Sequence, residues 1–156
     1  MKKWKSYALG AGLTLAVGAL SGLLSREGME IYAAAAAKPP LMPPDWLFPV
    51  VWTILYVLMG VGTAMVWMAV PGRARSRALN LFVLQLAVNF FWSLLFFNAQ
   101  AYGFSLLWLF LLWGLVLCMI LVFSEVDRTA ALLQIPYFIW LTFAAYLNFG
   151  VWLLNR

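Results

Sequence analysis

Five long apolar runs, with every charged residue lying outside them, most constrain how this chain can fold. The runs cover residues 6–24, 46–70, 78–99, 102–123 and 129–154. A membrane-spanning helix needs about 20 predominantly apolar residues, and a chain of 156 residues that is 66% hydrophobic and 10% charged has no room for a soluble domain as well. The runs therefore predict an all-α integral membrane protein, a single domain over residues 1–156 that crosses the lipid bilayer as a five-transmembrane-helix bundle.

The first connection, residues 25–45, is expected to be a long loop that ends in a proline-rich stretch. Five prolines fall within residues 39–49; each fixes its own φ and restricts the residue before it, so this stretch is expected to be extended and rigid. Asp45 has the short acceptor side chain favoured at a helix N-cap. Because aromatic residues follow at once, the loop is predicted to cover an aromatic pocket. Pro136, inside the last run, predicts a kink in the fifth helix.

The distribution of lysine and arginine predicts the orientation of the bundle. With five spans, the N-terminus, the second-to-third loop and the fourth-to-fifth loop share one side of the membrane. Seven basic residues lie on that side and three on the other: Lys2, Lys3, Lys5, Arg73, Arg75, Arg77 and Arg128 against Arg26, Lys38 and Arg156. Short loops rich in basic residues stay in the cytoplasm, so the N-terminus is predicted to be cytoplasmic and the C-terminus outside.

The first apolar run allows two interpretations. Lysines before an apolar stretch, with the alanines at residues 33–37 after it, are also the layout of a secretory signal, but the stretch is too long for a signal and favours a retained helix. Gly10, Thr14, Gly18 and Gly22 recur every four residues and form a seam on which another helix can pack closely. The seam predicts either packing within the chain or the interface of a homodimer.

Several kinds of chemistry are excluded by composition. The chain has no histidine, which removes the usual haem ligand, the usual zinc ligands and the commonest general base. Cys118, the one cysteine, lies in an apolar run, so neither a disulfide nor a Cys-x-x-Cys site exists. We therefore expect no metal site and no resident cofactor. The net charge of +5 comes from the connecting loops and indicates membrane topology, so no nucleic-acid partner is expected.

Polar and aromatic residues inside the spans form three stripes, which are informative because such residues usually face the bundle interior. The stripes are Trp52, Tyr56 and Thr63; Gln85, Asn89 and Trp92; and Tyr137, Trp140, Ala144 and Asn148. A rise of about 1.5 Å per residue brings the three stripes together in the outer half of the bundle, under the first loop. The fourth run, residues 102–123, has almost no polar residue and is assigned to packing and lipid.

The stripes predict a pocket for a planar, largely apolar ligand. Indole and phenol rings offer flat apolar faces with a few hydrogen-bond donors, and small Ala144 leaves room among bulky neighbours. A tetrapyrrole or a sterol fits this lining, and Arg26 and Lys38 at the mouth are the cations available to ligand carboxylates. The alternative is that the rings form interfacial belts and the amides only bridge helices. We favour the pocket, because belt residues need not share faces with amides at one depth.

The same residues resemble the TspO/MBR family (tryptophan-rich sensory protein, translocator protein, peripheral-type benzodiazepine receptor). The resemblance covers the first loop and four of the five spans, in the family's order and spacing. The matching pieces are Tyr32; Lys38-Pro39; Pro43-Pro44-Asp45-Trp46; Val51-Trp52-Thr53-Ile54-Leu55-Tyr56 with Met59-Gly60; Gln85-Leu86-Ala87-Val88-Asn89 with Trp92 and Phe96-Phe97; and Pro136-Tyr137 with Trp140, Phe143-Ala144 and Leu147-Asn148.

The resemblance implies a five-helix membrane bundle, commonly a dimer, that binds porphyrins such as protoporphyrin IX, cholesterol and benzodiazepine-site ligands. It implies ligand-binding roles for Tyr32, Trp52, Asn89, Trp92, Trp140 and Ala144, and a bacterial-type member in the cell membrane. Two alternatives stay open: light- and oxygen-dependent degradation of porphyrin, with Trp52 and Trp140 as candidate catalytic residues, and transport of a tetrapyrrole or sterol. A binding or sensory protein is favoured, because no acid, base or nucleophile lies inside a span and neither inverted repeats nor broken helices are visible.

Two departures from the family pattern bear on the ligand. Ile31 and Leu41 stand where the family often has tryptophan, which weakens the aromatic cap of the loop. The sterol motif needs a lysine or arginine within five residues of a tyrosine, and the first cation after Tyr146 is Arg156. A tetrapyrrole is therefore favoured over a sterol.

Overall fold

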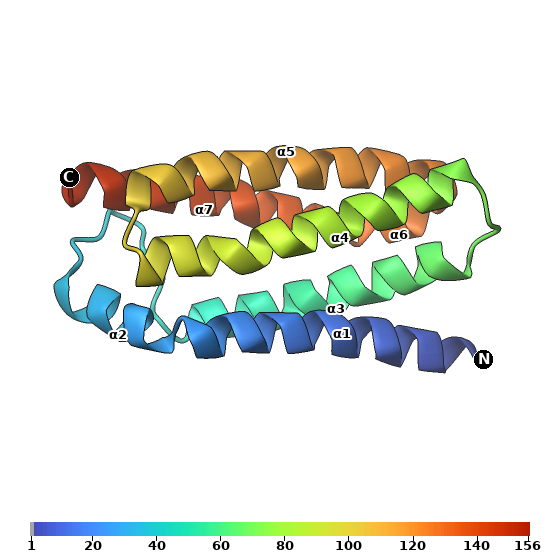
Figure 1. The fold of residues 1–156 in the computed structure, drawn as a ribbon, viewed down its shortest axis with the longest axis horizontal. Coiled ribbons are helices and arrows are strands. Elements are labelled where there is room, and N and C mark those ends of the chain that lie inside the picture. The colour runs from blue at the N-terminus through green and yellow to red at the C-terminus, as the bar shows by residue number, and fades with distance from the viewer. Residues whose placement is uncertain (1) are drawn as a thin grey trace.

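The computed structural model describes residues 2–156 as a bundle of long helices with no strand among those residues (Figure 1). Five apolar helical stretches are long enough to cross a membrane, which confirms the predicted fold class. The helices are α1 (Lys3–Leu24), α2 (Arg26–Ala35), α3 (Leu47–Met68), α4 (Arg73–Ser93), the π-helical turn η1 (Leu94–Asn98), α5 (Tyr102–Val126), α6 (Arg128–Leu132) and α7 (Ile135–Leu154). The stretch from α4 to η1 forms one span and that from α6 to α7 another.

The connections lie at two ends of the bundle, as five spans require. The N-terminus, the α3–α4 connection and the α5–α6 connection lie at one end in Figure 1. Helix α2, the proline-rich stretch, the α4–α5 connection and the C-terminus lie at the other, which we call the loop end. Arg73, Arg75 and Arg77, predicted to lie in the second-to-third loop, instead form the first turns of α4, at the same end as the N-terminus. The two sets of basic residues are therefore at opposite ends of the molecule.

The small-residue seam of α1 packs within the chain, against α3. A Cβ atom on Gly10 would collide with the carbonyl of Gly60, and one on Gly18 would collide with the ring of Tyr56. Between them the Thr14 hydroxyl is 2.6 Å from the Tyr56 carbonyl oxygen, which accepts its hydrogen bond. Three of the four seam residues are thus used inside one molecule, whereas a Cβ on Gly22 would meet nothing within 4 Å.

The segment predicted as a loop over residues 25–45 is partly helical, which corrects that prediction. Residues Arg26–Ala35 form α2, and only the part from Ala36 to Trp46 is irregular. The predicted N-cap role of Asp45 is also wrong: Trp46 precedes α3 and no side chain caps the helix. A tight turn replaces the cap, in which the Leu47 N–H donates to the Pro44 carbonyl at 3.0 Å.

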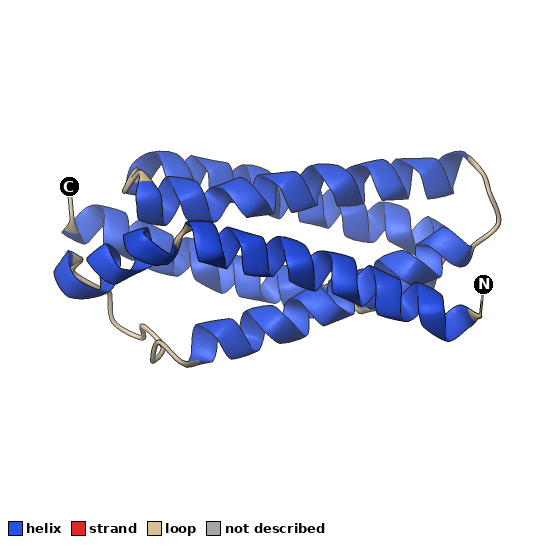
Figure 2. Ribbon diagram, turned by 60° about the horizontal axis from the view of Figure 1, so that its bottom comes forward, coloured by secondary structure: helices blue, strands red, loops and turns tan. Residues whose placement is uncertain are grey.

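The fifth span is broken rather than kinked. Helix α6 ends at Leu132, and α7 begins at Ile135 with Pro136 in its first turn, where a proline costs no hydrogen bond. Gln134 lies buried at the break and donates from Nε2 to the Leu58 carbonyl of α3 at 3.3 Å. Gly62 permits this approach, since a Cβ there would collide with Gln134 Nε2. Figure 1 labels the two helical pieces, and Figure 2 shows the bundle as a whole from a second direction.

Candidate functional site

A chain of hydrogen bonds between side chains crosses the middle of the bundle. The Tyr56 hydroxyl of α3 donates to Asn89 Oδ1 at 2.8 Å, and Asn89 Nδ2 donates to the Tyr137 hydroxyl at 2.6 Å. Tyr137 in turn donates to Gln85 Oε1 at 2.9 Å, and Gln85 Nε2 lies 3.3 Å from Met59 Sδ. These side chains are buried, and a buried polar group without a partner costs about 1–3 kcal/mol. These hydrogen bonds therefore fix the positions of α3, α4 and α7 relative to one another.

A second polar group lies toward the loop end, around Asn148 of α7. Asn148 Oδ1 accepts from Trp92 Nε1 at 3.2 Å and lies 3.3 Å from the Ser105 hydroxyl. Asn148 Nδ2 donates to the Tyr102 carbonyl at 2.9 Å. Asn148 therefore occupies the indole N–H of Trp92, and the Trp92 ring has mainly its flat face left for other contacts.

A cavity with residues of both polar groups in its lining lies inside the bundle. It is lined by Trp52 of α3, Asn89 and Trp92 of α4, Leu109 and Leu112 of α5, and Leu141 and Ala144 of α7. The cavity volume is about 10 Å³, which is near the smallest space that holds one water molecule. The lining is apolar apart from one amide and two indoles, and the site is closed in this structure.

The structure therefore brings four of the predicted site residues, Trp52, Asn89, Trp92 and Ala144, to one cavity. Tyr56, Gln85 and Tyr137 lie in the hydrogen-bonded chain beside it, and Asn148 holds Trp92. Leu109, Leu112 and Leu141 were missed. The first two lie on the span assigned to packing and lipid, and a leucine in an apolar helix carries no signal that separates a cavity lining from other packing.

Trp52 and Trp140, the two candidate catalytic tryptophans, have different surroundings. The Trp52 ring lines the cavity and packs against Tyr56 and Tyr137, with ring centroids 5.6 and 6.2 Å apart. Trp140 lies outside the cavity lining and packs edge-on against Phe48 at the start of α3, with centroids 5.8 Å apart. Of the two tryptophans, only Trp52 lines the cavity.

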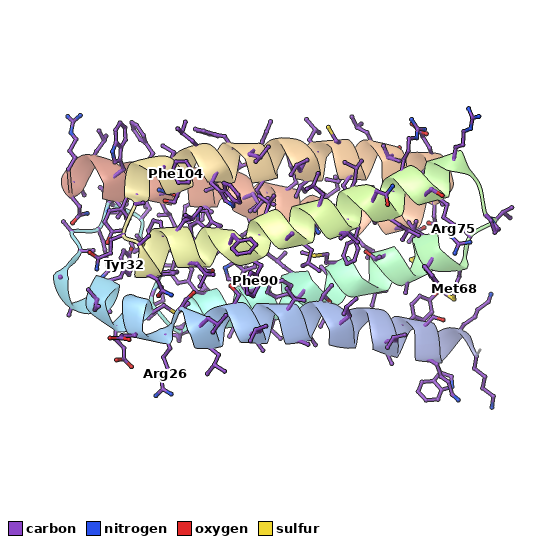
Figure 3. The ribbon with its side chains drawn as sticks, in the orientation of Figure 1. Arg26, Tyr32, Met68, Arg75, Phe90 and Phe104 are labelled. Atoms are coloured by element: carbon purple, nitrogen blue, oxygen red, sulfur yellow. The ribbon has the colours of Figure 1, made fainter. Side chains whose placement is uncertain are left out.

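Tyr32 of α2 reaches the site through other aromatic rings. Its ring lies 5.4 Å from both Phe96 and Phe97 of η1, and Phe96 stacks on Trp92 at 5.0 Å. Figure 3 shows Tyr32 directed from α2 toward the end of α4. Burial, with smaller contributions from Tyr102 and Asp45, raises the pKa of Tyr32 to about 12. The phenol is therefore neutral over the physiological pH range and adds no negative charge at the site.

The proline-rich stretch is fastened to the end of α7. Asn155 forms a reciprocal pair with the backbone of Ala37: the Ala37 N–H donates to Asn155 Oδ1 at 2.9 Å, and Asn155 Nδ2 donates to the Ala37 carbonyl at 2.8 Å. The Tyr146 hydroxyl donates to the Pro40 carbonyl at 2.8 Å. Pro39 is buried and lies against Gly150, where any Cβ would collide with the proline ring. These hydrogen bonds and the packing of Pro39 hold the proline-rich stretch over the loop end of the bundle.

The two mouth cations differ in what they can reach. Arg26 lies 3.7 Å from Glu30 on the exposed face of α2, and Figure 3 shows its side chain directed away from the bundle. Lys38 lies over the Tyr32 ring at 5.2 Å and 3.4 Å from the Ala33 carbonyl. Of these two cations, Lys38 is therefore the one that lies next to the Tyr32 ring. Among residues 2–156, no three histidine, cysteine or acidic side chains gather into a metal-ligand set.

These features define a class: a five-helix integral membrane protein with an aromatic-lined cavity under an anchored cover. The chain belongs to the TspO/MBR family, whose model matches residues 10–153. It is 38% identical to the tryptophan-rich protein TspO of Chlorobaculum tepidum, over 99% of this chain and 98% of that protein. It is 40% identical to protein CrtK of Rhodobacter capsulatus, over 76% and 74% of the two chains. It is 35% identical to the human translocator protein, over 93% and 88%.

Proposed function

We propose that this protein is a membrane binding or sensory protein for porphyrins such as protoporphyrin IX and for related planar apolar ligands. The observation that carries the proposal is the cavity in which Trp52 and Trp92 meet small Ala144 between four helices. Flat indole faces suit a flat conjugated ligand, and a lining with one amide suits a ligand with few polar groups. Lys38, at the loop end, is the cation that would pair with the carboxylates of such a ligand.

Binding requires the site to enlarge. Pockets for ligands of drug size measure about 300–1,000 Å³, far more than the 10 Å³ of this cavity. Two lining residues are hydrogen-bonded to other helices, Asn89 to Tyr56 and Tyr137 and Trp92 to Asn148. The other lining residues, Trp52, Leu109, Leu112, Leu141 and Ala144, make apolar contacts, so the site can enlarge on their side while these bonds stay in place. The proposal is therefore that the structure corresponds to a closed state and that the ligand binds an open one.

The test is dark titration of the purified protein with protoporphyrin IX, followed by the Soret band of the pigment. Ala144→Phe should weaken binding by about fivefold or more, because forcing extra atoms into a packed site costs about 1–3 kcal/mol. Ala87→Phe is the matched control: Ala87 is exposed on the lipid-facing side of α4, and its replacement should leave affinity unchanged. An Ala144→Phe variant that folds and binds like the unmodified protein would refute the pocket assignment.

A second candidate function is light- and oxygen-dependent degradation of porphyrin. The observation in its favour is that Trp52, an easily oxidised indole, lines the cavity, which places it against any bound pigment. Trp140 lies outside the lining, which makes it the weaker candidate of the two. Transport of a tetrapyrrole or sterol stays a prediction. The fifth span is broken between α6 and α7, where the sequence suggested no broken helix, but this break lies outside the cavity lining.

We also propose a cytoplasmic N-terminus, an outward-facing loop end and C-terminus, and location in a bacterial cell membrane. The support is the seven-to-three distribution of basic residues over the two ends. The homodimer stays a prediction, and Gly10, Thr14 and Gly18 are not its interface because they pack against α3.

A further inference from the structure

The α3–α7 seam differs from every other helix boundary of the bundle. The contacting pairs of long helices include α1–α3, α3–α4, α3–α7, α7–α5, α5–α4 and α4–α1. Among residues 2–156, five of these six pairs are joined by hydrogen bonds between the two helices, and none joins α3 to α7 itself. The bonds are Thr14 to the Tyr56 carbonyl, Tyr56 to Asn89, Ser21 to the Phe90 carbonyl, Trp108 to the Val88 carbonyl, and Asn148 to the Tyr102 carbonyl with Trp113 to Thr142.

Aromatic side chains close this seam where the helix backbones do not. Helices α3 and α7 share little backbone packing, and Phe48 meets Trp140 edge-on across the gap with ring centroids 5.8 Å apart. Phe48 lies one turn before Trp52, and Trp140 lies one turn before Ala144. Trp52 and Ala144 line the cavity, and Phe48 and Trp140 are both partly exposed, so the Phe48–Trp140 pair joins the cavity lining to the outer surface of the bundle.

The seam is fixed at its inner end and covered at its outer end. At the inner end Gln134 bonds to the Leu58 carbonyl and fits against Gly62. At the outer end the proline-rich stretch is fastened to α7 by Tyr146 and Asn155. An outward displacement of the first two turns of α3, which precede Tyr56 and make no hydrogen bond to α4 or α7, would open the outer half of the seam while the bonds of Tyr56, Tyr137 and Gln134 stay in place. It would separate the ring pairs Phe48–Trp140 and Trp52–Tyr137, and the resulting slot admits a flat molecule edge-on.

We propose that the ligand enters the cavity sideways from the bilayer, through a portal between α3 and α7 that Phe48 and Trp140 close. This inference rests on the proposed function. This route narrows the class of ligand, because the ligand must partition into the hydrocarbon of the membrane and must be thin in one dimension. Entry through the loop end would instead require breaking the Asn155 pair, the Tyr146 bond and the packing of Pro39 on Gly150.

The first test measures the rates of protoporphyrin IX binding to the full chain in lipid nanodiscs, in the dark, from the pigment's absorbance. Phe48→Ala should raise the association and dissociation rates together, by about two- to tenfold, the factor that corresponds to losing an aromatic pair. The dissociation constant should change by less than the rates. Phe149→Ala is the matched control, since Phe149 is an exposed ring of α7 whose aromatic partner is Trp152, away from the cavity lining.

The second test holds the portal shut. In a Cys118→Ala background, Phe48→Cys with Trp140→Cys is linked by a short thiol-specific cross-linker that a reductant cleaves. Linking should slow association by about tenfold or more, as a closed gate does, and reduction of the same sample should restore the rate. The control pair, Ala37→Cys with Asn155→Cys, links the cover to α7 and should leave the rate unchanged.

The outcomes separate the two proposals. If the link between positions 37 and 155 slows association while the link between positions 48 and 140 does not, the ligand enters at the loop end and the portal is overturned. Rates that respond to neither Phe48→Ala nor the α3–α7 link also overturn the portal while leaving the proposed function intact. If the unmodified protein fails to bind protoporphyrin IX, the proposed function is refuted and the portal with it.

Discussion

The Tyr137 hydroxyl joins two amides of α4, lying 2.6 Å from Asn89 Nδ2 and 2.9 Å from Gln85 Oε1. One phenol from α7 thus accepts one hydrogen bond and donates another, while Tyr56 of α3 donates to the same Asn89 at 2.8 Å. Three helices meet at one amide that also lines the cavity. The orientation of Asn89 is therefore set by its neighbours before any ligand arrives.

Removal of the Tyr137 hydroxyl should destabilise the fold. Tyr137→Phe leaves Asn89 Nδ2 and Gln85 Oε1 without their partner in a buried site, and the expected loss is about 1–3 kcal/mol in the free energy of unfolding. Thermal unfolding in detergent, followed by tryptophan fluorescence, measures it. Tyr146→Phe is the control, because Tyr146 is exposed and its bond is to a loop carbonyl. Equal losses in both variants would mean that the buried network adds no particular stability.

The close crossing of α1 on α3 should tolerate no side chain at Gly10. A Cβ there meets the Gly60 carbonyl, so Gly10→Ala forces the helices apart and should cost about 1–3 kcal/mol. Gly12→Ala, two residues away, adds a methyl group where nothing lies within 4 Å and should be neutral. Melting temperatures of the two variants in the same detergent provide the comparison. A stable Gly10→Ala variant would show that α1 can shift on α3 at little cost.

The role of tryptophan in any light reaction can be separated from its role in binding. Phenylalanine keeps a flat apolar ring but lacks the indole N–H, so Trp52→Phe and Trp140→Phe should each weaken dark binding by about 0.5–1.5 kcal/mol at most. For a binding protein, illuminated protoporphyrin IX should bleach at one rate with the unmodified protein and both variants. Faster bleaching with a defined product, lost in Trp52→Phe while dark binding remains, would instead identify an enzyme.

The sidedness of the bundle can be measured by thiol labelling in intact cells after Cys118→Ala. Ser76→Cys and Ala34→Cys place an exposed thiol at the two ends, beside the arginines of α4 and on α2 respectively. With a cytoplasmic N-terminus, an impermeant reagent should label position 34 in intact cells and position 76 only after lysis. The reverse pattern would mean that the orientation is inverted. Ser25 is unsuitable for this purpose because it is fully buried.

The spans were predictable from the sequence because a single property, the length of apolar runs, determines them. Helix α2 was not predicted, although signals for it exist. Alanine is the best helix former, and Arg26 with Glu30 is a favourable i, i+4 pair. The prolines that indicated an extended loop begin only at Pro39, beyond the end of α2. Their influence on the backbone reaches one residue back, which leaves Arg26–Ala35 free to form a helix.

The candidate site was predictable only in part, for a different reason. Trp52, Asn89, Trp92 and Ala144 stood out because aromatic, amide and small residues are unusual on one face of a membrane helix. The sequence could not show that Asn89 is already engaged by Tyr56 and Tyr137, since such pairing depends on how three helices pack. Nor could it show that Trp140 faces Phe48 instead of the cavity, because helix periodicity fixes a face and not the neighbour it meets.

The cavity of about 10 Å³ also determines what a measured affinity means for this protein. If the open conformation is a small fraction of the population, the apparent dissociation constant exceeds the intrinsic one by the inverse of that fraction. A ligand with excellent contacts can then bind only moderately, and a substitution that favours the open conformation can tighten binding although it removes a contact. Affinities of different ligands for one variant share the same factor and report on contacts. Affinities of one ligand for different variants report on the population as well.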